Sequence, residues 1–363
     1  MEKLSAELVH LIFEDACDDI RGETARSLGL VSKRFRAIAE TFEFRHISVS
    51  GPNQVEHLVT RLKSIESEND HPHINIQHLF VCDYTKEHAL YEDTRDPDKS
   101  HHYRGFSGNF LDTSEGDKIR CHYNDIRSEF WSLVGCALRI AAPTLRSLGL
   151  LSFHWPSYHQ EWLQDEQLPD DYDLLALLSR TNINFPQLRT LTIRHRYNSE
   201  KWKGLGPINA PLLKELWLIV RSCFFGSHDG KVLHPLLQDM HSRHPFLSQL
   251  VIRWWELDTF DRIMEVICDN EENGVNSVSN CIRNHVLPGV LKSVVIQLNR
   301  TPIFYCGTGL MNHRRQAFSF VEDIENRNIP GLRVSPPTAT FPKVGERDYE
   351  YLFKQWEERS HRL

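Results

Sequence analysis

The sequence has no long hydrophobic run, no closely spaced cysteine pair and no excess of basic residues. Its apolar runs are short, with five residues in Leu216–Val220, whereas a helix that crosses a bilayer takes about 20 residues. Lysine and arginine number 42 against 49 acidic residues, which gives a net charge of −7. Because phosphate backbones and anionic membranes require a basic surface, we expect neither nucleic acid nor a membrane as the main ligand.

Neither the N-terminus nor the cysteines indicate secretion. The first apolar stretch contains His10 and is flanked by acidic residues, where a signal peptide has a basic segment and a cleavage site. The closest cysteines lie 13 positions apart, whereas a disulfide framework is typical of short, cysteine-dense chains. We therefore expect reduced thiols and a cytoplasmic and/or nuclear location. The eight cysteines are Cys17, Cys82, Cys121, Cys136, Cys223, Cys268, Cys281 and Cys306.

Recognisable catalytic and metal-binding motifs are also missing. His-Glu-x-x-His is absent, although the chain has 20 histidines. Gly204–Gly206 runs into a proline, and Gly307–Gly309 is not followed by the lysine of a phosphate-binding loop. Gly105–Gly108 lacks the final glycine of a nucleophile elbow. We expect no enzymatic activity, no metal and no cofactor; a hydrolase or metalloenzyme with a site built from dispersed residues is the less favoured alternative.

What the chain does contain is a globular composition, with 40% hydrophobic and 25% charged residues. Its 363 residues suit about two domains or one elongated repeat structure. Either is long enough to bury a core without disulfides or structural metals.

The first 45 residues predict two or three short amphipathic helices. Ser5 is a helix-capping residue, and Glu7 places a negative charge in the first turn. Apolar residues recur at helical spacing on both sides of a polar break at 18–22. A unit of about 45 residues buries too little apolar area to be stable alone. We therefore expect these helices to pack on the remaining chain or on a partner. The two patterns are Leu8, Val9, Leu11, Ile12, Phe13 and Ala16, then Leu28, Val31, Phe35 and Ile38.

These two patterns resemble an F-box of the fungal type. Leu4–Phe13 reads Leu-Ser-Ala-Glu-Leu-Val-His-Leu-Ile-Phe, and Leu28–Ile38 reads Leu-Gly-Leu-Val-Ser-Lys-Arg-Phe-Arg-Ala-Ile. The family has Leu-Pro-x-Glu-hydrophobic-x-x-x-Ile-hydrophobic, then Leu-x-Leu-Val-Ser/Cys-Lys-aromatic or basic-Arg. Ser5 departs from this pattern by replacing the proline, although serine also serves as a helix cap.

The resemblance implies that residues 1–45 dock onto the small Skp-type adaptor of a cullin–RING ubiquitin ligase. Such a contact buries an amphipathic helical surface against the helices of a partner. The alternative is that the same residues only cap a larger core of this chain. The residues that match apolar positions of the family, and that we expect to form the contact or its supporting core, are Leu4, Leu8, Ile12, Phe13, Leu28, Val31 and Phe35.

A short phrase recurs along the rest of the chain: a proline, then Leu-Arg/Lys-x-Leu-x-Leu/Ile. Helical patterns stand in several of the gaps between copies, at 129–142, 171–180, 231–243 and 259–269. The gaps between first apolar positions vary from 25 to 69 residues. Copies begin at Pro143, Pro186, Pro211 and, more loosely, Pro245, and two further copies with a shifted proline begin at Ile76 and Leu291.

Repeated units of strand plus helix are similar to leucine-rich repeats, in which each unit packs against its neighbours. We therefore predict an α/β fold, with a short helical F-box followed by an irregular leucine-rich-repeat-like solenoid that has a curved parallel sheet. An ordinary irregular α/β domain is the alternative. The Asn or Cys that usually follows the strand is replaced here by Phe153, Arg196, Arg221 and Trp255.

The Leu-x-Leu residues are expected to point into the core, so the residues between them line the other face of the sheet. Aromatic residues and arginine dominate binding hot spots. We select four such residues as candidates for contact with a target protein, with burial of the aromatic ones under loops or terminal segments as the alternative. These candidates are Phe80, Arg194, Trp217 and Arg253.

Three further segments complete the predicted domain organisation. Residues 86–124 form a polar insert within the repeat-like domain, 46–330. The C-terminal part, 331–363, begins as an extended strap, since 329–343 carries four prolines. A final helix over about 348–359 is expected to seal the last repeat with Tyr351, Leu352 and Trp356.

Together these features favour a substrate-recognition subunit of an SCF-type ubiquitin ligase, which holds the adaptor through its N-terminus and an unknown protein substrate through its body. A protein-interaction scaffold outside any ubiquitin ligase is the alternative.

Overall fold

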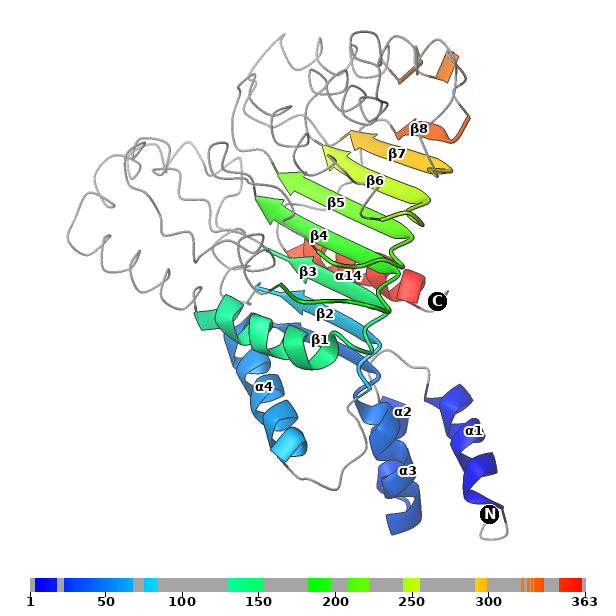
Figure 1. The fold of residues 1–363 in the computed structure, drawn as a ribbon, viewed down its shortest axis with the longest axis vertical. Coiled ribbons are helices and arrows are strands. Elements are labelled where there is room, and N and C mark those ends of the chain that lie inside the picture. Colours follow the sequence, from blue (N-terminus) through cyan, green and yellow to red (C-terminus); the bar gives the residue numbers. More distant parts are fainter. Residues whose placement is uncertain are drawn as a thin grey trace, which may run out of the picture.

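The computed structural model describes part of the chain. The described residues form an α/β fold with one parallel sheet of eight strands (Figure 1), so the predicted parallel α/β architecture is confirmed. The described ranges are 4–17, 23–67, 75–83, 129–152, 182–196, 208–221, 244–254, 291–298, 321–322, 325–326, 328, 330–335 and 346–360.

The eight strands follow one another in the sheet in the order of the sequence, from β1 to β8. Neighbouring strands pair in parallel with one register, so His46 lies opposite His78, which lies opposite Ser147. All six strands predicted from the recurring phrase are present. The strands are β1 (His46–Ser50), β2 (His78–Cys82), β3 (Ser147–Leu151), β4 (Thr190–Arg196), β5 (Glu215–Arg221), β6 (Gln249–Trp254), β7 (Ser293–Leu298) and β8 (Leu332–Ser335).

The two strands at the edges of the sheet were not predicted. β1 follows directly on the N-terminal helices, and β8 lies in the segment 329–343 that we expected to be an extended strap. Leu332–Ser335 is thus extended, as expected of the strap, but it is also a paired strand of the sheet. Pairing with β7 gives this segment backbone partners, and its proline-rich flanks do not interrupt four residues of strand.

One face of the sheet carries the main core. The inward Leu-x-Leu residues of the phrase, such as Leu148 and Leu150, are buried there as predicted. The helical residues 129–141 pack on this face with Trp131 and Leu138, which confirms the helix expected at 129–142. Helix α4 (Gly51–Ser67) joins them through Val55, Leu58, Val59 and Leu62.

Helix α4 was missed although its apolar residues have the i, i+3, i+4, i+7 spacing of an amphipathic helix. The helices expected at 171–180, 231–243 and 259–269 lie outside the described residues, as does the polar insert 86–124. Among the helices that are described, none is both long and apolar enough to cross a membrane.

Part of the opposite face of the sheet is covered by helix α14 (Glu346–Ser360), which is seen behind β3 and β4 in Figure 1 and packs on residues of β2, β3 and β5. The C-terminal helix expected at 348–359 is thus present, but the expectation that it seals the last repeat is wrong. Leu352 and Trp356 pack on Phe80, Leu151 and Ile219 instead, because the central strands offer apolar side chains on this face.

The N-terminal helical unit consists of α1 (Ala6–Ala16), α2 (Glu23–Gly29) and α3 (Lys33–Glu43), and it lies beside the sheet where the strands begin (Figure 1). Its buried residues form a cluster that is separate from the two sheet cores. This cluster contains Val9, Phe13, Cys17, Ala25, Ala39 and Phe42. The domain boundary at residue 45 stays a prediction.

Candidate partner-binding surfaces

Two serine caps start the helices that build the N-terminal unit. The Ser5 hydroxyl accepts from the Leu8 backbone N–H at 3.3 Å, and the Ser32 hydroxyl accepts from the Phe35 N–H at 3.1 Å. Each cap satisfies one of the backbone donors that a helix N-terminus leaves open. Glu7, in the first turn of α1, has its pKa lowered by hydrogen bonds from its own backbone N–H and from Ser5.

The Ser32 cap gives a first testable expectation. Ser32→Ala should lower the free energy of unfolding by about 1 kcal/mol, because the Phe35 N–H loses its acceptor at the start of α3. Urea unfolding monitored by circular dichroism measures the change. Ser64→Ala, at an exposed site inside α4, is the matched control and should be neutral or slightly stabilising. Equal effects in the two variants would contradict the cap.

Helix α1 is apolar on two faces, and one of them is buried within the unit. Val9, Phe13 and Cys17 follow one another at intervals of four and are at most 3% exposed. Phe13 packs edge-to-face on Phe35 at 5.1 Å between ring centroids. The unit therefore has its own small core.

The second apolar face of α1 is open. Leu8 is 50% exposed, Leu11 59% and Ile12 50%. The turn between α2 and α3 adds Leu30 at 81% and Val31 at 65%. The hydrogen bond from Arg34 Nη2 to the Leu4 carbonyl, at 2.6 Å, holds the start of α3 to the start of α1. We call these five exposed side chains the apolar surface of the N-terminal unit.

Of the seven predicted adaptor-contact residues, some belong to this apolar surface and the others to the core of the N-terminal unit beneath it. Leu8, Ile12 and Val31 are exposed, whereas Phe13 is buried. Leu4, Leu28 and Phe35 are half-buried against the unit's core. The sequence reasoning left out Leu11 and Leu30, although both have a simple signal: Leu11 lies one helical turn from Leu8, and Leu30 lies next to Val31.

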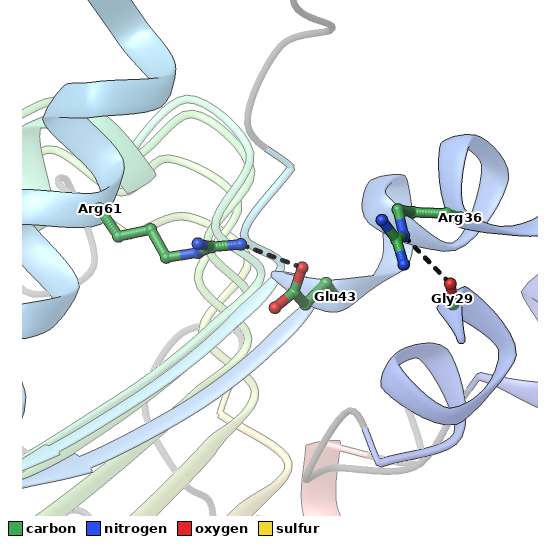
Figure 2. A network of polar contacts seen from close by, with 4 residues as sticks. All are labelled: Gly29, Arg36, Glu43 and Arg61. Carbon is green, nitrogen blue, oxygen red and sulfur yellow. Dashed lines mark hydrogen bonds and ion pairs between the residues drawn. The ribbon is translucent and has the colours of Figure 1, made fainter. Parts of the chain in front are cut away.

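Arginine contacts hold the helices of the N-terminal unit together and join the unit to helix α4 of the sheet domain. Arg36 Nε donates to the Gly29 carbonyl at 3.2 Å between α3 and α2, and Arg61 of α4 pairs with Glu43 at 3.5 Å (Figure 2). Arg61 also lies over the Phe44 ring at 5.5 Å. Since the Arg61–Glu43 pair is exposed, it orients the unit more than it stabilises it.

The second candidate surface, the face of the sheet opposite the main core, is closed where the target-binding residues were predicted. Phe80 is fully buried against Trp356 and Phe353, with ring centroids 5.2 and 5.1 Å away. Trp217 is half-buried, with the Arg359 guanidinium 3.8 Å above its ring. Phe80 is therefore not an exposed target-binding residue, and the alternative, burial under a terminal segment, is confirmed because α14 covers it.

The predicted exposure of Arg194 is wrong as well. Only 4% of this residue is exposed, and its Nη1 donates to the Ser152 carbonyl at 2.7 Å. Ser152 in turn donates its hydroxyl to Asp83 at 2.9 Å. Arg194 thus ties together the ends of β2–β4. Arg253 belongs to β6, and its side chain lies outside the described part of the chain.

Polar contacts also hold α14 on the sheet. Arg359 Nη2 donates to the Thr192 hydroxyl at 3.0 Å, and the Ser360 hydroxyl lies 3.3 Å from that of Ser147. Gly149 provides the room for this packing: a Cβ at that position would lie 2.6 Å from Phe80 Cδ2 and 3.3 Å from Trp356 Cδ1. Glycine here allows a close approach of the helix to the sheet.

Within the described residues, no group of three or more histidine, cysteine, aspartate or glutamate side chains is placed to hold a metal ion. Comparisons with protein-family models, curated proteins and solved structures gave no match.

Proposed function

We propose that the chain is a substrate-recognition subunit of an SCF-type cullin–RING ubiquitin ligase, with an F-box-like unit that binds a Skp-type adaptor. The observation that carries the proposal is the second apolar face of α1. That helix already buries Val9 and Phe13 in the unit's own core, yet it leaves Leu8, Leu11 and Ile12 open. Exposed apolar groups that cluster in this way are typical of protein-binding surfaces.

The N-terminal unit packs around a core of its own, which favours this function over the alternative that the unit only caps the core of the sheet. A cap would contribute its apolar residues to the core that it closes, whereas the cluster around Phe13 is distinct from the main core of the sheet. The three helices are also positioned beside the strand starts and not stacked on either face (Figure 1). Both observations favour a unit that presents its surface outward.

The sheet domain also supports a recognition role, because its strands are arranged like those of a repeat array. Each strand pairs only with its sequence neighbours, which is the arrangement of leucine-rich-repeat-like arrays. Such arrays present long surfaces to other proteins. The chain then performs no chemistry itself: it raises the effective concentration of target lysines near a ubiquitin-charged enzyme.

Co-purification with the Skp-type adaptor tests the proposal. Wild type should bind the adaptor, and Leu8→Asp with Val31→Asp should weaken binding at least about tenfold, because two charges would be desolvated at the interface. Titration calorimetry on the purified partners measures the affinity.

The matched control is Phe246→Asp, which places the same charge at a 57% exposed apolar residue of the body. It should leave adaptor binding unchanged. If wild type does not bind the adaptor, or if the double variant binds as well as wild type, the proposal is wrong.

A further inference from the structure

A row of basic residues runs along the edge of the sheet where the strands begin. A basic residue stands directly before five of the eight described strands: Arg45 before β1, Arg146 before β3, Arg189 before β4, Lys214 before β5 and Lys292 before β7. Uncharged residues precede the other three, and one of them, Ser248 before β6, stands between Lys214 and Lys292. Backbone hydrogen bonds join these positions across the sheet, among them Arg189 N–H to the Arg146 carbonyl and Lys214 N–H to the Arg189 carbonyl, both 2.8 Å. We call these five residues the basic ladder.

The ladder concentrates positive charge in a chain whose net charge is −7. Neighbouring strands lie about 4.8 Å apart, so the cations on β3, β4 and β5 follow one another closely. Burial and the nearby charges of Arg189 and Arg45 lower the pKa of Arg146, and only Glu14 acts in the opposite direction. Among the described residues, none is ion-paired with Arg189, Lys214 or Lys292.

At one end of the ladder, Arg45 already contacts the C-terminal turn of α1, which carries a partial negative charge. Arg45 Nη1 donates to the Glu14 carbonyl at 3.4 Å, in the last turn of α1. The C-terminal end of a helix carries a partial negative charge, and the Glu14 carboxylate adds to it near Arg146. Beyond that end, Arg189 is half-buried, and Lys214 and Lys292 are exposed.

We propose that Arg189, Lys214 and Lys292 form a docking surface for an acidic polypeptide segment, rich in aspartate and glutamate, of a partner protein. Charge complementarity identifies the occupant: three cations stand along one edge of the sheet, and at the other end Arg45 already donates to the Glu14 backbone carbonyl, at the negative end of α1. Glu215 follows Lys214 directly, but strand alternation places it with Trp217 and Ile219, on the sheet face that α14 covers.

Nucleic acid is the less suited occupant. Duplex binding that depends on phosphates commonly uses about 6–10 contacts, whereas the open part of the ladder offers three cations on an acidic chain. The inference goes beyond the adaptor contact, since it concerns a different surface. Whether the acidic segment is part of the ligase target rests on the proposed function.

Fluorescence anisotropy with a labelled polyglutamate peptide tests the inference on the full chain. About eight residues suffice, since the strands from β4 to β7 span about 15 Å and an extended chain covers about 3.3 Å per residue. Wild type should bind at low salt and lose the peptide near 0.5 M salt, at about which exposed charges are screened. Arg189→Glu with Lys214→Glu should weaken binding at least about tenfold.

The matched control has the same change in net charge away from the ladder. Lys63→Glu with Lys354→Glu alters two exposed lysines, on α4 and α14, and should change the affinity by less than about twofold. If circular dichroism shows that the reversal variant is misfolded, Lys214→Gln with Lys292→Gln, at two exposed sites, replaces it and should also weaken binding.

Three results would overturn the inference: no binding by wild type at low salt, an equal loss in the control, or tighter ladder-dependent binding of a single-stranded oligonucleotide of equal charge. The adaptor-surface variant, Leu8→Asp with Val31→Asp, should retain peptide binding, because neither residue belongs to the ladder. Failure of adaptor binding and failure of the ladder are thereby distinguished.

Discussion

Trp356→Ala should lower the free energy of unfolding by about 3–5 kcal/mol. The indole is fully buried and packs on the Phe80 and Phe353 rings at 5.2 and 5.9 Å between centroids. Its removal leaves a cavity between α14 and the sheet, bordered by Leu151 and Ile219. Because these neighbours sit on paired strands, they cannot move to fill the space.

Urea unfolding followed by far-ultraviolet circular dichroism measures this loss. Lys354→Ala is the matched control on the exposed side of the same helix and should change stability by less than about 0.5 kcal/mol. A loss below about 1 kcal/mol for Trp356→Ala would show that α14 does not pack on the sheet as described.

Gly149→Val should lower the free energy of unfolding by about 2–3 kcal/mol through overpacking. The new Cβ would lie 2.6 Å from Phe80 Cδ2, well inside contact distance. Phe80 cannot turn away, since Phe353 and Trp356 hold it from the helix side. Helix α14 must therefore shift to admit the side chain.

Gly29→Ala is the matched control, because a Cβ there would meet no atom closer than 3.9 Å. Alanine in α2 should be neutral or stabilising by up to about 1 kcal/mol. Combining Gly149→Val with Trp356→Ala should cost less than the sum of the single losses, since the cavity accepts the added methyls. Additive losses would contradict direct contact between Gly149 and Trp356.

The strands of the central sheet were predictable because their evidence is local. Each copy of the phrase ends on two residues that are Leu, Ile or Val and stand two positions apart, and the two-residue period of a strand brings these to one face. Leu148 and Leu150 are buried accordingly. The edge strands β1 and β8 were missed because neither carries the phrase.

The position of α14 was not predictable from its own sequence. Leu352 and Trp356 indicate an amphipathic helix, but such spacing does not say which surface the helix covers. The partners Phe80, Leu151 and Ile219 lie far away in the sequence. For the same reason the burial of Phe80 could not be chosen over its exposure from the sequence.

In the N-terminal unit, the sequence indicated apolar positions but not their division between inside and outside. Phe13 and Ile12 are adjacent, and one is 3% exposed whereas the other is 50% exposed. The division depends on where α3 packs against α1, which brings Phe35 onto Phe13. Spacing alone assigns Leu8 and Val9 to neighbouring positions of a wide apolar stripe.

The path of the chain has a consequence for its synthesis. Helix α14 follows all the strands that it covers, so on a ribosome the face that carries Phe80 and Leu151 is complete before its cover has been made. Apolar surface that is exposed in this way promotes aggregation of nascent chains and engages chaperones. A product truncated after β8 would retain the N-terminal helical unit but display a bare apolar sheet face. Such a fragment is expected to be sequestered or degraded rather than to compete with the intact protein.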